Sequence, residues 1–160
     1  MRNKLFILIG ILLISFTCFG CSVKKYNATI YDNVGEYLNK EFIETMKIQG
    51  VSFIDEAKTL PTDRETLILT QEAFNKAFNN TSNINVDFSR QMVVIYTYTA
   101  INQRSISLKE IDYDRKDGSL DIDLRIKRTT KRGDTCEPYQ RFLVVVMDKL
   151  SVVDLDVDVD

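Results

Sequence analysis

The sequence predicts an α+β domain in which one or two helices precede an antiparallel β-sheet of about five strands. Apolar residues recur with a helical period in two segments before residue 80, and the period changes to two after residue 85. An Asp-Gly pair, Asp117-Gly118, lies between two alternating segments, which is a strong short-range signal for a β-hairpin. With 160 residues, 44% hydrophobic and 28% charged, the chain has the size and composition of one globular domain.

The expected helices lie in the first half of the chain. The apolar residues of the first recur every four positions: Val34, Leu38, Phe42 and Met46. Asn33 is a candidate N-cap for this helix and Gly50 a candidate end. A short apolar strand at 67–69 then leads into a second helix over 71–79, for which Thr70 is the expected N-cap.

Five segments after residue 85 are predicted to be strands: 92–99, 105–113, 119–127, 142–147 and 152–159. The segment 92–99 is a continuous run of β-branched and aromatic residues, so we expect it to be central in the sheet. In 119–127 the apolar residues alternate with charged ones. We therefore expect Leu120, Ile122 and Leu124 to face the core and Asp121 and Asp123 to face solvent.

Residues 1–20 are predicted to be an export signal. Arg2 and Lys4 precede the apolar stretch 5–16, and Gly20 followed by Cys21 resembles the lipobox of bacterial lipoproteins. We therefore expect Cys21 to carry diacylglyceryl and palmitate chains, residues 21–33 to be a tether, and 34–160 to form a single globular domain. An uncleaved membrane anchor over 5–23 and simple secretion are the alternatives. All three export the domain, and the lipoprotein interpretation places it in the bacterial cell envelope, anchored to the membrane.

The composition excludes several kinds of chemistry. The chain has no histidine, which removes Ser-His-Asp and Cys-His nucleophile activation. A formal charge of −2 gives no field that would attract nucleic acid, and there is no glycine-rich phosphate loop. Cys136 would have no disulfide partner within the chain, because Cys18 would leave with the signal and Cys21 would carry lipid. It is interpreted as a bystander because no histidine can activate it; a nucleophile and an intermolecular disulfide partner are the alternatives. The sequence thus predicts no enzyme, no cofactor and no nucleic-acid partner.

The acidic tail 154–160 raises the alternative of a calcium site. On a strand, alternate side chains are roughly 6.6 to 6.8 Å apart, whereas the oxygens around one calcium lie about 5 Å apart at most. We therefore interpret these acids as the outward side chains of an edge strand, where they discourage pairing with another chain. Residues 112–118 depart from the EF-hand pattern, since Lys116 takes the fifth position and Gly118 the seventh.

Basic residues gather near one predicted loop and form a candidate partner-binding patch: Arg125, Lys127, Arg128, Lys131 and Arg132. Such a patch would suit an acidic partner or an anionic surface. The alternative is a solvated strand end and loop without a partner.

The order of segments after residue 64 resembles a known family. The segments are 66–74, 86–94 with its Val-Asp-Phe-Ser start, 105–108, the Asp117-Gly118 hairpin, and 136–146 with its Pro138-Tyr139 pair. Over residues 64–149 this order is similar to the PrcB-type domain of bacterial protease-complex lipoproteins. The resemblance implies a non-catalytic accessory role, and it adds Pro138 and Tyr139 to the candidate partner-binding residues.

From these observations we expect a membrane-anchored, extracytoplasmic lipoprotein that binds another exported protein and could stabilise a protease complex. A small envelope enzyme that uses carboxylates is one alternative. A calcium- or ligand-binding module that uses the acidic tail is another.

Overall fold

The computed structural model describes residues 26–46, 64–100, 104–128 and 139–159. Within these residues it confirms the α+β class. The elements in chain order are β1 (Ala28–Asp32), the 3-10 helix η1 (Gly35–Tyr37), α2 (Lys40–Met46), β2 (Arg64–Ile68), α3 (Gln71–Ala77), β3 (Gln91–Ala100), β4 (Arg104–Asp114), β5 (Ser119–Arg128), β6 (Tyr139–Asp148) and β7 (Asp154–Val159).

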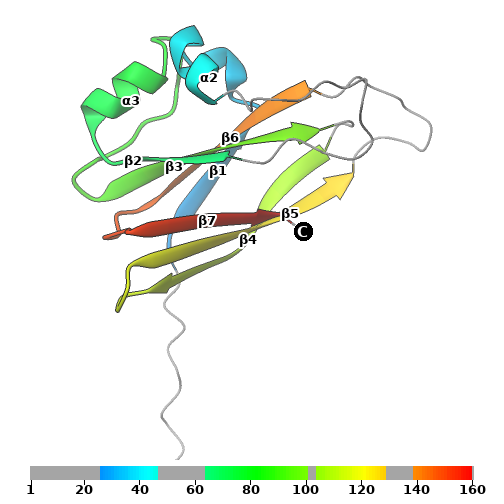
Figure 1. Ribbon diagram of the computed structural model, residues 1–160. Coiled ribbons are helices and arrows are strands. Elements are labelled where there is room, and N and C mark those ends of the chain that lie inside the picture. Colours follow the sequence, from blue (N-terminus) through cyan, green and yellow to red (C-terminus); the bar gives the residue numbers. More distant parts are fainter. Residues whose placement is uncertain (1–25, 47–63, 101–103, 129–138, 160) are drawn as a thin grey trace, which may run out of the picture.

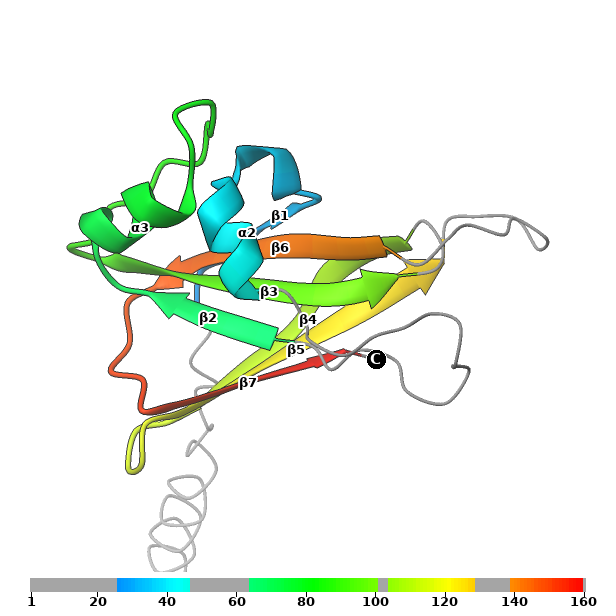
Figure 2. The ribbon, with the colours of Figure 1, turned by 45° about the horizontal axis from the view of Figure 1, so that its top comes forward.

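The strands form two sheets that pack face to face. Four antiparallel strands form one sheet in the order β1-β6-β3-β2, and β4-β5-β7 form the other. β7 runs parallel to β5, which differs from the purely antiparallel pairing that the sequence predicts. The helices lie on the face of the four-stranded sheet that points away from β4-β5-β7 (Figures 1 and 2). The domain therefore has three layers: helices, sheet and sheet.

The central strands β3 and β6 are buried on both faces. Val93 and Ile95 of β3 pack in the core under the helices, whereas Met92, Val94 and Tyr96 pack in the core between the sheets. This double burial explains why the segment 92–99 has an apolar or β-branched residue at almost every position. The expectation that it is central is confirmed.

The first expected helix is divided, and a strand precedes it. Residues 28–32, which we assigned to the tether, form β1 and pair with β6. Leu38 lies between η1 and α2 in an isolated β-bridge with Phe78, so its backbone cannot continue a helix. The side-chain amide of Asn39 donates to the carbonyl oxygens of Lys76 and Phe78, which holds this break in place. Asn33 has a φ of 58° and is not an N-cap; Gly50 lies outside the described residues.

The second helix follows its expectation closely. The Thr70 hydroxyl oxygen accepts a hydrogen bond from the Ala73 N–H at 3.2 Å, which confirms the N-cap. The helix ends at Ala77, two residues earlier than expected, and the strand before it is Arg64–Ile68. The five later strands all form, at bounds within a few residues of those predicted.

Candidate functional site

The outer face of the sheet β4-β5-β7 carries most of the features that suggest a function. Along β5, Leu120, Ile122 and Leu124 are fully buried between the sheets, as expected. Successive side chains of a strand point to opposite faces, so Asp121 and Asp123 project outward. The described helices lie on the far side of the other sheet, so none of them covers this face (Figure 2).

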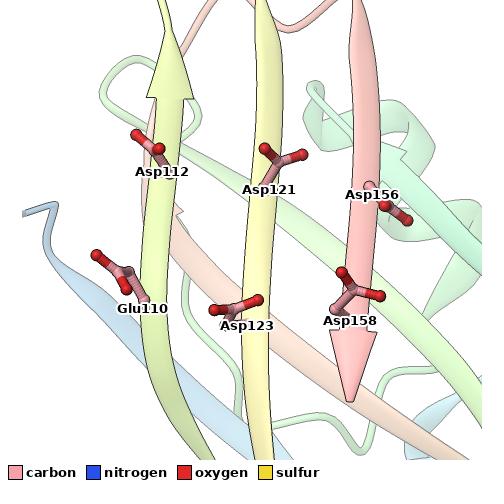
Figure 3. Close-up of a pocket in the computed structure, with 6 residues that line it drawn as sticks. All are labelled: Glu110, Asp112, Asp121, Asp123, Asp156 and Asp158. Carbon is pink, nitrogen blue, oxygen red and sulfur yellow. The ribbon is translucent and has the colours of Figure 1, made fainter. Parts of the chain in front are cut away.

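Six carboxylates on this face form two rows across the three strands. In the first row Asp112 of β4 pairs with Asp121 of β5, which pairs with Asp156 of β7. In the second row the partners are Glu110, Asp123 and Asp158. We call these six residues the acidic face. They line one shallow hollow, and all are exposed except Asp123, which is half-buried (Figure 3).

Asp121 has neighbouring acids on both adjacent strands. The pKa of its carboxyl is raised, and the largest cause is loss of hydration. The negative charges of the neighbouring acids raise this pKa further, in the order Asp156, Asp112, Asp158 and Asp123. Asp123 differs because Lys109 Nζ lies 3.5 Å from its Oδ2. Lys109 occupies the position where the β4–β5 register shifts, between Leu108 and Glu110. The register shift in β4 thus coincides with a lysine beside the second row of acids.

The opposite end of the same face is basic. Arg125 and Lys127 follow Asp123 on β5 at alternate positions and are exposed. Their neighbours on β4 are the small polar residues Ser107 and Ser105. The face therefore carries negative charge toward the β4–β5 turn and positive charge toward the end of β5.

The turn between β4 and β5 aligns the three acidic strands. Gly118 has a φ of 80°, a conformation that few other residues adopt. The Asp114 carboxylate accepts a hydrogen bond from the Lys116 N–H, and the Asp117 carboxylate accepts one from the Ser119 N–H. The Gly118 carbonyl oxygen accepts a hydrogen bond from the Val153 N–H at 2.9 Å. This last bond brings the start of β7 beside the start of β5.

The predicted partner-binding residues are only partly described. Arg125 and Lys127 lie on the outer face, while Arg128 ends β5 and Tyr139 begins β6. Cys21, the predicted lipidation residue, lies outside the described ranges. Four further residues singled out in the sequence also lie outside them: Lys131, Arg132, Cys136 and Pro138.

The acidic face is not one feature of the predicted fold. The acids of 154–160 are expected on an edge strand, and those of 119–127 on the solvent side of a hairpin. The available signal is the alternation of acidic and apolar residues, which occurs in both segments. It occurs again at 112–114, on the other side of the hairpin. Adjacent pairing of strands with this shared pattern places their acids on one surface.

The arrangement suits binding of cationic groups by several separate carboxylates. Across the described ranges, no group of three or more acidic or thiol side chains is arranged to hold a metal ion. In the same part of the chain, no helix is long and apolar enough to cross a bilayer.

Comparisons with protein-family models, with curated proteins and with solved structures find no match to this chain.

Proposed function

We propose that this chain is a non-catalytic accessory lipoprotein, anchored in a bacterial envelope membrane through Cys21, that binds another exported protein. The outer face of β4-β5-β7 is its partner-binding surface. The observation that carries this proposal is the charge separation on that face, with six carboxylates at one end and Arg125 and Lys127 at the other. Complementary charge across an interface accelerates encounter and selects the orientation of the partner.

The shape of the face supports binding to a macromolecule. Its charged groups are spread over three strands and open to solvent, which suits a protein surface better than a small molecule, because ligand pockets are usually concave and mostly apolar. The export signal, the Gly20-Cys21 pair and the resemblance to PrcB-type domains supply the location and the accessory role. A protease complex is one kind of partner that this resemblance suggests.

Partner capture with matched charge variants tests the proposal. Crosslinking in intact cells, followed by purification and mass spectrometry, would compare the wild type with D121N/D158N and with R125Q/K127Q. We expect both variants to capture less of the same exported protein. The control is E72Q/K76Q, which removes the exposed ion pair on α3 at the opposite side of the domain. Equal capture by all four proteins would contradict the proposed surface.

A second candidate function is acid–base chemistry by carboxylates. One observation favours it: Asp121 has a raised pKa within a hollow lined by five other acids. Paired carboxylates in different environments can act as a general acid and a general base. Loss of a hydrolytic activity in D121N, with partner capture unchanged, would support this function over the binding proposal.

A further inference from the structure

The described chain begins at the end of the domain that holds the β4–β5 turn. The Tyr26 ring packs edge-on against Tyr113 of β4, with ring centroids 6.3 Å apart. The Asn27 N–H donates to the Asp148 carboxylate at 3.0 Å, and the Asp148 N–H donates back to the Asn27 carbonyl oxygen. The segment that enters β1 is thus attached to this end by contacts to both sheets.

We call this region the hairpin end: residues 26–27, the turn with its flanking residues 113–119, and the connection 149–153. Hydrogen bonds join the turn to the connection. The Tyr113 hydroxyl donates to the Ser151 carbonyl oxygen at 2.7 Å, and the Val153 N–H donates to the Gly118 carbonyl oxygen. These contacts attach the hairpin end to both sheets.

The anchor residue lies a short distance along the chain from the hairpin end. Tyr26 is five positions after Cys21, and five residue steps cannot span more than about 18 Å even when fully extended. The opposite end of the charged face is out of this range, because β5 rises by roughly 3.3 Å per residue, or about 26 Å from Ser119 to Lys127. A lipid on Cys21 therefore holds the hairpin end close to the bilayer.

The hairpin end also has the residue types that suit a lipid–water interface. Val153 is 83% exposed, the most exposed large hydrophobic residue among those described. Arg115 and Lys116 are exposed on the turn, where Asp114 and Asp117 balance their charge. Tyr26 and Tyr113 add half-buried aromatic rings, a side-chain type enriched at membrane interfaces.

The acidic face disfavours another orientation that the tether permits, in which the domain lies flat on this face. All six carboxylates would then approach the anionic lipids of a bacterial membrane and be repelled by them, whereas the end-on orientation brings only the first row near the bilayer. From these observations we infer that the hairpin end rests on the surface of the bilayer that anchors Cys21. The strands then point away from the membrane, and Arg125 and Lys127 face outward. This inference rests on the proposed lipidation and deepens it.

The absence of tryptophan from the chain allows a direct test with one reporter per variant. The lipoprotein would be purified and reconstituted into vesicles of brominated phosphatidylcholine, which quenches tryptophan fluorescence at short range. V153W and K116W place the reporter at the hairpin end, and K127W places it at the far end of β5. We expect V153W and K116W to lose much of their fluorescence relative to unbrominated vesicles, and K127W to keep it.

Two results would overturn the inference: equal quenching of all three variants, or stronger quenching of K127W. A second arm separates this failure from failure of the proposed lipidation. Mass spectrometry of protein from cells shows whether Cys21 carries lipid. In the second arm the same variants, made in the chain 21–160 with C136S, are coupled through Cys21 to a maleimide lipid. Quenching there tests the orientation even where natural lipidation is absent.

Discussion

Asp121 of β5 lies directly opposite Asp156 of β7, and both side chains project from the outer face of the same sheet. Asp112 lies opposite Asp121 on the other side. Like charges placed opposite each other on neighbouring strands destabilise a sheet. The fold thus keeps an unfavourable row of charges at its surface.

Replacing Asp121 with asparagine should stabilise the domain at neutral pH. The pKa of Asp121 is raised in the folded state above its ordinary value of 3.8. The folded chain therefore holds this proton more tightly than the unfolded chain does. The stabilisation from that proton is complete below the unfolded-state pKa and is lost as pH rises through the folded-state pKa. At pH 7 we expect D121N to gain about 0.5–1 kcal/mol of unfolding free energy at low salt.

Urea denaturation at several pH values measures this effect. The gain should shrink in molar salt, because salt screens exposed charges, and it should vanish at pH 3, where Asp121 is protonated. E41Q is a suitable control, since Glu41 is exposed on α2, away from the acidic face. A D121N variant that is no more stable than wild type at pH 7 would show that the row carries no strain.

Chelation should leave the melting temperature unchanged. A metal that binds only the folded state stabilises that state, so removal of the metal lowers Tm. In the described part of the chain, no three acids are arranged around a common metal position. We expect EDTA to have no effect and calcium to act like sodium chloride of equal ionic strength, as measured by differential scanning calorimetry. A fall in Tm with EDTA that calcium reverses would instead establish the calcium alternative.

Local patterns predicted the strands, but long-range contacts decided how they assemble. Alternation along β5 correctly placed Leu120 and Leu124 in the core. The parallel pairing of β7 with β5 depends on the chain path after β6 and on the bond from Val153 to Gly118, which no local period encodes. The two acids that β7 adds to the acidic face follow from that pairing, whereas the four on β4 and β5 follow from the predicted hairpin.

The helical region shows the same limit. The spacing of Val34, Leu38 and Met46 correctly marks three buried residues, but the backbone between them is not one helix. The β-bridge from Leu38 to Phe78 satisfies backbone groups across a separation of forty residues. A four-residue apolar period therefore predicted burial better than it predicted the backbone conformation.

Removing the hydroxyl of Thr97 should destabilise the core. Thr97 is fully buried, and its hydroxyl donates to the Arg141 carbonyl oxygen at 3.0 Å. The Thr97 hydroxyl oxygen also accepts a hydrogen bond from Gln140 Nε2, which donates as well to the Met46 carbonyl oxygen at the end of α2. T97V keeps the shape but leaves these groups with fewer partners, so we expect a loss of about 1–2 kcal/mol.

Urea denaturation of T97V and T97S distinguishes the hydroxyl from the methyl group. T97S keeps the hydrogen bonds and removes only a methyl group, so it should retain more stability than T97V. The reverse order would mean that packing of the methyl group, and not this network, stabilises the contact between α2 and the sheet.

Substituting Gly118 with alanine should weaken the turn that aligns β5 and β7. Its φ of 80° disfavours any side chain, and an added Cβ would lie 2.8 Å from Val153 Cγ2 and 3.0 Å from the Ser151 carbonyl oxygen. We expect a loss of roughly 1–3 kcal/mol for the backbone conformation and the contact together. The double variant G118A/V153A separates these two causes, because it removes the contact with Cγ2 but keeps the unfavourable φ.

Thermal denaturation of G118A, V153A and the double variant measures both parts. V153A alone should be close to wild type, since the side chain is 83% exposed. The double variant should recover part of the stability lost in G118A, and the remainder reports the backbone strain and the contacts with the Ser151 oxygen and the residue-153 Cβ. If G118A were as stable as wild type, the turn would have to relax. The start of β7 would then be held beside β5 by the strand pairing alone, without the constraint at Gly118.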